Sequence, residues 1–221
     1  MLQMNLEELR RIQEEMSRSV VLEDLIPLEE LEYVVGVDQA FISDEVVSCA
    51  VKLTFPELEV VDKAVRVEKV TFPAIPTFLM FREGEPAVNA VKGLVDDRAA
   101  IMVDGSGIAH PRRCGLATYI ALKLRKPTVG ITKKRLFGEM VEVEDGLWRL
   151  LDGSETIGYA LKSCRRCKPI FISPGSYISP DSALELTRKC LKGYKLPEPI
   201  RIADKLTKEV KRELTPTSKL K

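Results

Sequence analysis

The sequence predicts an α/β fold built on a mixed β-sheet with helices on its faces. Three segments rich in β-branched residues, 33–42, 45–55 and 58–72, follow one another with short turns between them, as antiparallel strands do. Two almost continuous apolar runs, 99–105 and 127–132, come next and are separated by a helical segment, which is typical of parallel strands buried on both faces. We therefore expect three antiparallel strands and then parallel strands, joined by right-handed crossovers.

The first helices flank these strands. Residues 4–19 repeat apolar side chains at helical spacing, with charged residues opposite, which predicts an N-terminal docking helix. Its apolar face carries Met4, Leu6, Leu9, Ile12 and Met16. The two prolines of "PAIP" (73–76) end the third strand because they lack the N–H that a ladder needs, and a helix from about 77 to 93 is expected to follow.

The second half of the chain continues the same alternation. A helix is expected over "PRRCGLATYIALKLR" (111–125), with Pro111 in its first turn, where a missing N–H costs little. Three further strands are predicted before two last helices, and a lysine-rich tail begins at about 214. These strands are expected at 147–151, 155–161 and 169–173, and the helices near 180–192 and 199–212.

The composition is that of one globular domain spanning residues 1–221, which we expect to be a monomer in the cytoplasm. No apolar run is long enough to cross a membrane, and the charged start is unlike a signal peptide. The 34 basic side chains nearly balance the 33 acidic ones, so a nucleic-acid surface would have to come from local clusters. The five cysteines are expected to be reduced, and the single C-x-x-C of Cys164 and Cys167 favours a hairpin loop over half a zinc site.

Three carboxylates interrupt apolar stretches. They are Asp38 in "VVGVDQAF", Glu83 in "LMFREGEP" and Asp104 at the end of "AAIMVDG". Burying an unpaired carboxylate is unfavourable, so Asp38 could instead face solvent and Asp104 could serve a turn. A strand, its parallel neighbour and the helix between them can also bring all three together. That would give an all-oxygen site of the kind that Mg²⁺ prefers, with Mn²⁺ as a substitute.

Six segments that occur in a fixed order over about 170 residues together resemble one known protein family. They are "VGVDQAF", "FPAIPTFLMFREGEP", "VDGSGIAHPRRCGLA", "PTVGITKKRLFGE", "PIFISPGSYIS" and "LPEPIRIADKL". Together they resemble endonuclease V, the deoxyinosine 3′ endonuclease. The resemblance implies a ribonuclease H-like fold and magnesium-dependent cleavage of an inosine-containing DNA strand, at the second phosphodiester bond on the 3′ side of the lesion. The products would be a 3′-hydroxyl and a 5′-phosphate, and the cut would initiate repair of deaminated adenine.

The resemblance also assigns catalytic residues. Asp38, Glu83 and Asp104 match the metal-binding triad, and Lys133 matches an active-site lysine, although it could be a plain surface lysine. His110 matches a position beside the metal site, where an imidazole could orient water, contact phosphate or transfer a proton near neutral pH. The alternative is a helix-start histidine bonded to backbone. Asp204 is a candidate fourth acid, with an exposed helical residue as the alternative.

A base pocket is implied beside the metal site, because enzymes of this kind take the modified base out of the stack. The residues matched to it are Gly105, Ser106, Gly107, Gly115, Leu136 and Leu79. The glycines allow close backbone approach, although "GSG" could simply be a tight turn and Leu79 could be core.

The chain departs from the family at the strand wedge, formed by Pro73, Ala74, Ile75 and Pro76. The family commonly has tyrosine where Ala74 stands, and a methyl group cannot stack on a base. We therefore expect weaker strand separation on duplex DNA, so that single-stranded or mismatched inosine substrates fare relatively better.

Basic residues near the same face are expected to contact the DNA backbone, a solvated charged surface being the alternative. They are Arg112, Arg113, Lys134 and Arg135, with Lys162, Arg165, Arg166 and Lys168 as further members. Two other functions remain open from the sequence. One is an endoribonuclease specific for inosine in RNA, since the 2′-hydroxyl is not read by any recognisable motif. The other is a catalytically weak nucleic-acid-binding protein of the same fold.

Overall fold

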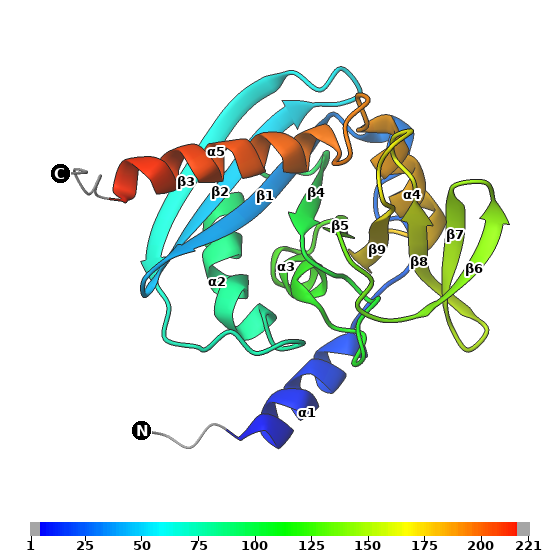
Figure 1. The fold of residues 1–221 in the computed structure, drawn as a ribbon, viewed down its shortest axis with the longest axis horizontal. Coiled ribbons are helices and arrows are strands. Elements are labelled where there is room, and N and C mark those ends of the chain that lie inside the picture. The colour runs from blue at the N-terminus through cyan, green and yellow to red at the C-terminus, as the bar shows by residue number, and fades with distance from the viewer. Residues whose placement is uncertain (1–4, 216–221) are drawn as a thin grey trace.

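A single mixed sheet organises the chain in the computed structural model, which describes residues 5–215. Nine strands in this part of the chain are ordered β3-β2-β1-β4-β5-β9-β8-β7-β6 (Figure 1). Their bounds are β1 Tyr33–Ile42, β2 Glu45–Thr54, β3 Val60–Lys69, β4 Ala99–Asp104, β5 Thr128–Thr132, β6 Glu139–Glu144, β7 Leu147–Asp152, β8 Glu155–Leu161 and β9 Ile170–Ser176.

The predicted α/β class and strand directions are confirmed. Strands β1, β2 and β3 pair antiparallel, and β4 and β5 then run parallel to β1. Beyond β5 the sheet returns to antiparallel pairing through β9, β8, β7 and β6. Strand β6 was not predicted, because its residues "EMVEVE" are mostly exposed and carry three glutamates in place of a buried apolar face.

Helices cover both faces of the sheet. Along β1, Val35 packs with Ala87 of α2 on one face, while Val34 packs with Ala203 of α5 on the other. This alternation follows from the two-residue repeat of a strand, which points successive side chains to opposite faces. The helix bounds are α1 Leu6–Ser17, α2 Met80–Val91, α3 Leu116–Leu124, α4 Pro180–Lys189 and α5 Glu198–Leu214, with a short 3₁₀ helix η1 at Leu28–Glu30.

Two helices begin later than predicted. Helix α2 starts at Met80 instead of about 77, because Thr77 has a φ of 69°. Helix α3 starts at Leu116 instead of 111, because Arg113 has a φ of 53°. A left-handed residue cannot belong to a right-handed helix, so each helix begins only after this residue, three residues further along the chain.

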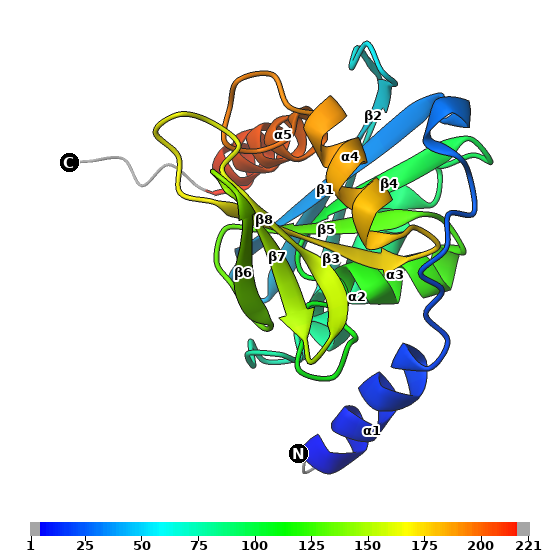
Figure 2. The ribbon, with the colours of Figure 1, turned by 90° about the vertical axis from the view of Figure 1, so that its right-hand side faces the viewer.

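The N-terminal helix α1 projects from one end of the molecule (Figure 2). Met4 and most of the predicted lysine-rich tail lie outside the described residues. No helix in residues 5–215 is long and apolar enough to cross a membrane. The expectation of reduced cysteines is wrong for Cys164 and Cys167, which form a disulfide. A turn places their Cα atoms 5.2 Å apart, a separation that suits such a bond.

Candidate active site

Strand register brings two of the predicted acids side by side. Strands β1 and β4 are parallel and pair Val37 with Val103, so that Asp38 and Asp104 follow at the same level on adjacent strands. Adjacent strands lie about 4.8 Å apart. Glu83 comes from the first turn of α2, and Asp204 from α5, which packs across β1. Four carboxylates from β1, β4, α2 and α5 therefore lie near the carboxyl end of β4, in the interior of the sheet.

These acids interact electrostatically. The pKa of Asp38 is raised to about 7 by burial and then by the charge of Asp104, with Asp204 adding to the effect. The pKa of Glu83 is likewise raised to about 7, chiefly by burial, while nearby Arg82 opposes the shift and Asp104 and Asp38 add to it. Negative charge on this cluster is thus unfavourable without a cation.

Lys133 is the cation in contact with Asp104. Its Nζ donates a hydrogen bond to Asp104 Oδ2 at 2.9 Å. Burial lowers the pKa of Lys133, but the contact with Asp104 and the charges of Asp38 and Asp204 raise it overall. Asp204 is itself paired with Lys208, at 2.6 Å. The predicted acids and Lys133 are therefore brought together in one cluster.

The donor chemistry of this cluster fits a hard divalent cation. Within residues 5–215, neither Asp38 nor Glu83 has a lysine or arginine in salt-bridge contact, so their charges lack a paired partner. No three His, Cys, Asp or Glu side chains in that part of the chain already stand as a ready set of metal ligands.

A cavity of about 340 Å³ lies beside the acids. Glu83 and Asp104 border it directly, and its volume is within the usual range for small-molecule sites. Eight further lining residues were singled out from the sequence: Ala74, Pro76, Leu79, Gly105, Ser106, His110, Gly115 and Leu136. The remaining lining residues are Gln13, Thr77, Met80 and Leu116. The acidic cluster and the predicted base pocket are thus adjacent.

Gly107 differs from the other predicted pocket residues. It is buried and does not line the cavity. Its amide donates to Ser173 Oγ at 2.8 Å, and a Cβ there would lie 2.1 Å from the Pro174 carbonyl oxygen. Glycine is required at this position for close packing against β9. Pro73 and Ile75 also lie outside the cavity lining, on the loop that carries Ala74.

His110 is buried and held by two hydrogen bonds. Its Nδ1 accepts from the Arg112 amide at 3.1 Å, so Nε2 carries the proton of the neutral ring and donates to the Thr77 carbonyl at 2.9 Å. Burial lowers the pKa of His110 to about 4, and the nearby Arg112 charge adds to that shift. The ring is therefore uncharged near neutral pH, which leaves it poorly suited to proton transfer there.

A titration of this single imidazole tests that assignment. We expect the ring ¹H and ¹³C signals to titrate with a midpoint near pH 4, and the only histidine in the chain needs no sequence assignment. The unfolded chain takes up this proton nearer pH 6.5, so His110 adds stability above that value and loses it as pH falls towards 4. A midpoint near 6.5 would contradict the buried, neutral ring.

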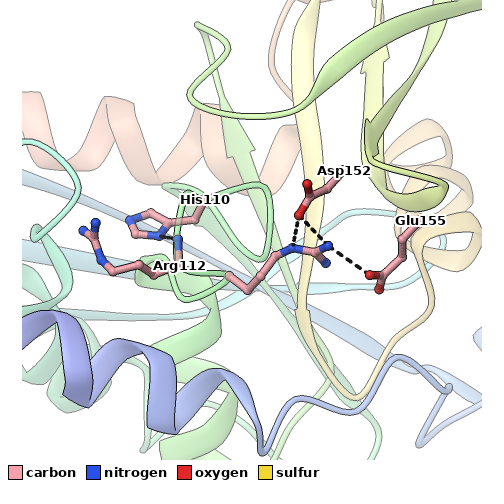
Figure 3. A network of polar contacts seen from close by, with 5 residues as sticks. His110, Arg112, Asp152 and Glu155 are labelled. Carbon is pink, nitrogen blue, oxygen red and sulfur yellow. Dashed lines mark hydrogen bonds and ion pairs between the residues drawn. The ribbon is translucent and has the colours of Figure 1, made fainter.

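The two arginines after His110 are bound within the protein, on either side of the turn. Arg113 contacts Asp152 at 2.7 Å and Glu155 at 2.9 Å, which join it to the β7–β8 hairpin (Figure 3). Arg112 donates to Gln13 Oε1 at 2.6 Å and packs over the Phe78 ring. Both arginines, which were expected to contact phosphate, are therefore already bonded to partners within the protein.

The other predicted basic residues are exposed. Lys134 and Arg135 follow Lys133 on the segment between β5 and β6, beside the cavity residue Leu136. A second group lies on the connection between β8 and β9 and comprises Lys162, Arg165, Arg166 and Lys168. These side chains remain available to a polyanion.

Sequence reasoning missed four cavity residues, which are Gln13, Thr77, Met80 and Leu116. One signal was present for Gln13. It falls on the same helical face as Leu9, Ile12 and Met16, and a polar residue within an apolar face is a sign of a specific buried contact. Nothing comparable marks Thr77, whose place depends on contacts far away in the chain.

Comparison with known proteins identifies the family to which the chain belongs. The endonuclease V family model matches residues 14–205. Endonuclease V of Nostoc punctiforme is 39% identical over 206 residues, covering 91% of this chain and 93% of its own. The crystal structure of endonuclease V from Streptomyces avermitilis is 34% identical with a TM-score of 0.87, covering 96% of this chain and 95% of its own.

A third relative is known with a nucleic acid bound. Ciona intestinalis endonuclease V, 25% identical with a TM-score of 0.82, was solved in complex with a 23mer DNA containing an inosine followed by a ribo-adenosine. That comparison covers 95% of this chain and 98% of the Ciona protein. The match of the family model over most of the sequence shows that this chain belongs to the endonuclease V family of nucleases.

Proposed function

We propose that this protein is a magnesium-dependent endonuclease that cuts a DNA strand at the second phosphodiester bond 3′ to deoxyinosine and so initiates repair of deaminated adenine. The observation that carries the proposal is the shared border between the cavity and the acidic cluster, at Glu83 and Asp104. A base held in the cavity would keep its own strand beside those carboxylates. Cleavage near a base, rather than at the base, fits that arrangement.

The base would be taken out of the helix into this cavity. Leu79 and Leu136 line it and are 40% and 44% exposed, so a purine ring would cover apolar surface that water now touches. Ser106 offers its amide and hydroxyl groups, neither of which has a hydrogen-bond partner within residues 5–215. Gly115 allows the backbone of Ser106 to pack closely against it, because a Cβ at position 115 would lie 2.3 Å from Ser106 O.

The cutting step would take place at the acidic cluster. Asp38, Glu83 and Asp104 would hold Mg²⁺, or Mn²⁺ in its place, which supplies Lewis-acid activation of the phosphate and of an attacking water. Asp204 lies close enough to Asp38 to influence its charge. The Lys133 ammonium, which donates a hydrogen bond to Asp104, would neutralise charge that develops on the phosphate. Attack at phosphorus with departure of the 3′ oxygen would leave the 5′-phosphate.

The decisive experiment compares DNA and RNA strands of one sequence, each with a single inosine, in single- and double-stranded form. Magnesium-dependent cutting of the DNA at the second bond 3′ to inosine, blocked by a chelator, supports the proposal. Preferred cutting of RNA would instead favour the endoribonuclease, an alternative motivated by the ribo-adenosine in the DNA bound to the Ciona enzyme. Inosine binding without any cutting would indicate a binding protein.

Restoring an aromatic ring at the wedge is expected to tighten duplex binding. Ala74 is exposed and lines the cavity, so a ring there would reach the place that a base leaves. Stacking is worth about 1–3 kcal/mol, so Ala74→Tyr is expected to lower the Kd for inosine-containing duplex DNA roughly tenfold. Fluorescence anisotropy checks this, with Ala74→Leu as a control that adds apolar bulk without a ring. Equal affinity of the tyrosine and leucine variants would contradict the stacking argument.

A further inference from the structure

We propose that Gln13 of α1 is a positioning residue for base recognition, because its side-chain amide holds the loop that carries the wedge and one wall of the cavity. The inference rests on the proposed function and extends it to a helix that contributes no acid to the cluster. Gln13 is completely buried and lines the cavity, although α1 otherwise projects from the molecule (Figure 2).

The Gln13 amide is fully used. Its Nε2 donates to the carbonyl oxygens of Thr77 at 2.9 Å and Cys114 at 3.1 Å. Its Oε1 accepts from Arg112 Nε at 2.6 Å. One side chain thus joins the wedge loop to the turn that leads into α3. Both segments border the cavity, through Thr77 and Gly115.

The Thr77 carbonyl is where these contacts meet. Besides Gln13, it accepts from His110 Nε2 at 2.9 Å and from Arg112 Nη2 at 2.9 Å. Thr77 has a φ of 69°, a left-handed conformation that β-branched residues rarely adopt. Such backbone persists when surrounding contacts hold it. The three donors therefore fix the loop between Ala74 and Leu79, both of which line the cavity.

Only an amide satisfies this set of partners. Two carbonyl oxygens require N–H donors, and the Arg112 guanidinium requires an acceptor on the same side chain. A methionine of similar length would remove the bond that each of the three partners makes to residue 13, and a carboxylate would face two carbonyl oxygens. The side chain is therefore suited to fixing the relative placement of loop and turn, which hydrophobic packing alone would not specify.

Little else joins α1 to the body at this point. Leu9, Ile12 and Met16 are only partly buried, and Gln13 is the one fully buried residue of the helix. If Gln13 served packing alone, an apolar replacement would preserve or improve the contact. If it serves positioning, the same replacement would loosen the pocket while the fold remains.

The experiment uses the full chain and compares wild type with Gln13→Met, and with Glu15→Gln on the exposed side of α1 as the matched control. The probes are single-stranded DNA with one inosine and the same strand with adenosine. We expect Gln13→Met to raise KM and Kd for the inosine strand about tenfold, with kcat changed less than about threefold. Binding of the adenosine strand should stay close to wild type, Gln13→Met should still melt in one cooperative transition although the lost bonds lower its melting temperature, and Glu15→Gln should match wild type throughout.

A second variant tests whether the effect passes through the hydrogen-bond network that Gln13 and Arg112 share around Thr77. Arg112→Met removes another donor to the same oxygen, so Gln13→Met and Arg112→Met together are expected to weaken inosine binding by less than the product of their separate effects. Wild-type inosine discrimination in Gln13→Met would overturn the inference, as would a fall in melting temperature and kcat with KM unchanged. Either result leaves the proposed function standing, because that proposal fails only if the wild-type protein does not cut inosine-containing DNA.

Discussion

Asp38→Asn is expected to reduce cleavage of an inosine-containing strand by on the order of 1000-fold, with inosine binding largely retained. Asparagine keeps the size of the side chain and removes the charge needed to hold a divalent cation. Asp38 does not line the cavity, so the contacts to the base should remain. Single-turnover cleavage at saturating magnesium measures the first effect, and anisotropy with a labelled inosine strand measures the second.

The control is Asp145→Asn, which removes one carboxylate from an exposed turn outside the cluster. It should cut at the wild-type rate, which separates loss of the specific acid from a change in net charge. Comparable cleavage by Asp38→Asn and wild type would remove Asp38 from the catalytic cluster.

The same substitution should not weaken the fold. Burial and the charge of Asp104 raise the pKa of Asp38 to about 7, so ionisation costs stability in the folded protein. A carboxyl with a raised folded pKa adds stability below its unfolded value, and that contribution is lost as pH rises through about 7. At pH 8 without divalent cations, Asp38→Asn should therefore melt at or above the wild-type temperature. An inactive variant that also melted lower would point to damage to the fold.

The sequence was informative where one local pattern determines the outcome. Strands β1, β4 and β5 were predicted because apolar runs fix their burial, and Asp38 and Asp104 stood out because each interrupts such a run. Their convergence follows from parallel pairing, which a helix between two buried strands already implies. Strand β6 lacked a buried face and could not be distinguished from a loop.

The sequence was less informative where distant contacts decide. Arg113 was expected to meet phosphate, but it pairs with Asp152 and Glu155, which lie 39 and 42 residues further along the chain. The network around Thr77 spans 64 residues to Gln13. Neither partner could be chosen from periodicity or composition, because many charged and polar residues were equally available.

Gly36→Ala is expected to be the most destabilising of these changes, costing about 3 kcal/mol of unfolding free energy and about 10 °C in Tm. A Cβ at Gly36 would lie 2.0 Å from the carbonyl oxygen and 2.8 Å from the Cα of Pro199, at the start of α5. These are backbone atoms, so no side chain can move aside, and strand and helix must separate. The helix also places Ile200 and Ala203 in the core. Chemical denaturation and thermal melting measure the loss.

Gly93→Ala is the matched control, because a Cβ there would meet nothing within 4 Å. Its stability should equal or slightly exceed that of wild type, since alanine restricts the unfolded chain more than glycine does. The cleavage rate of Gly36→Ala provides a second measurement. Helix α5 carries Asp204 close to Asp38, so a displaced helix should slow cleavage even well below the melting temperature. Full activity in a destabilised variant would contradict the expected displacement of Asp204.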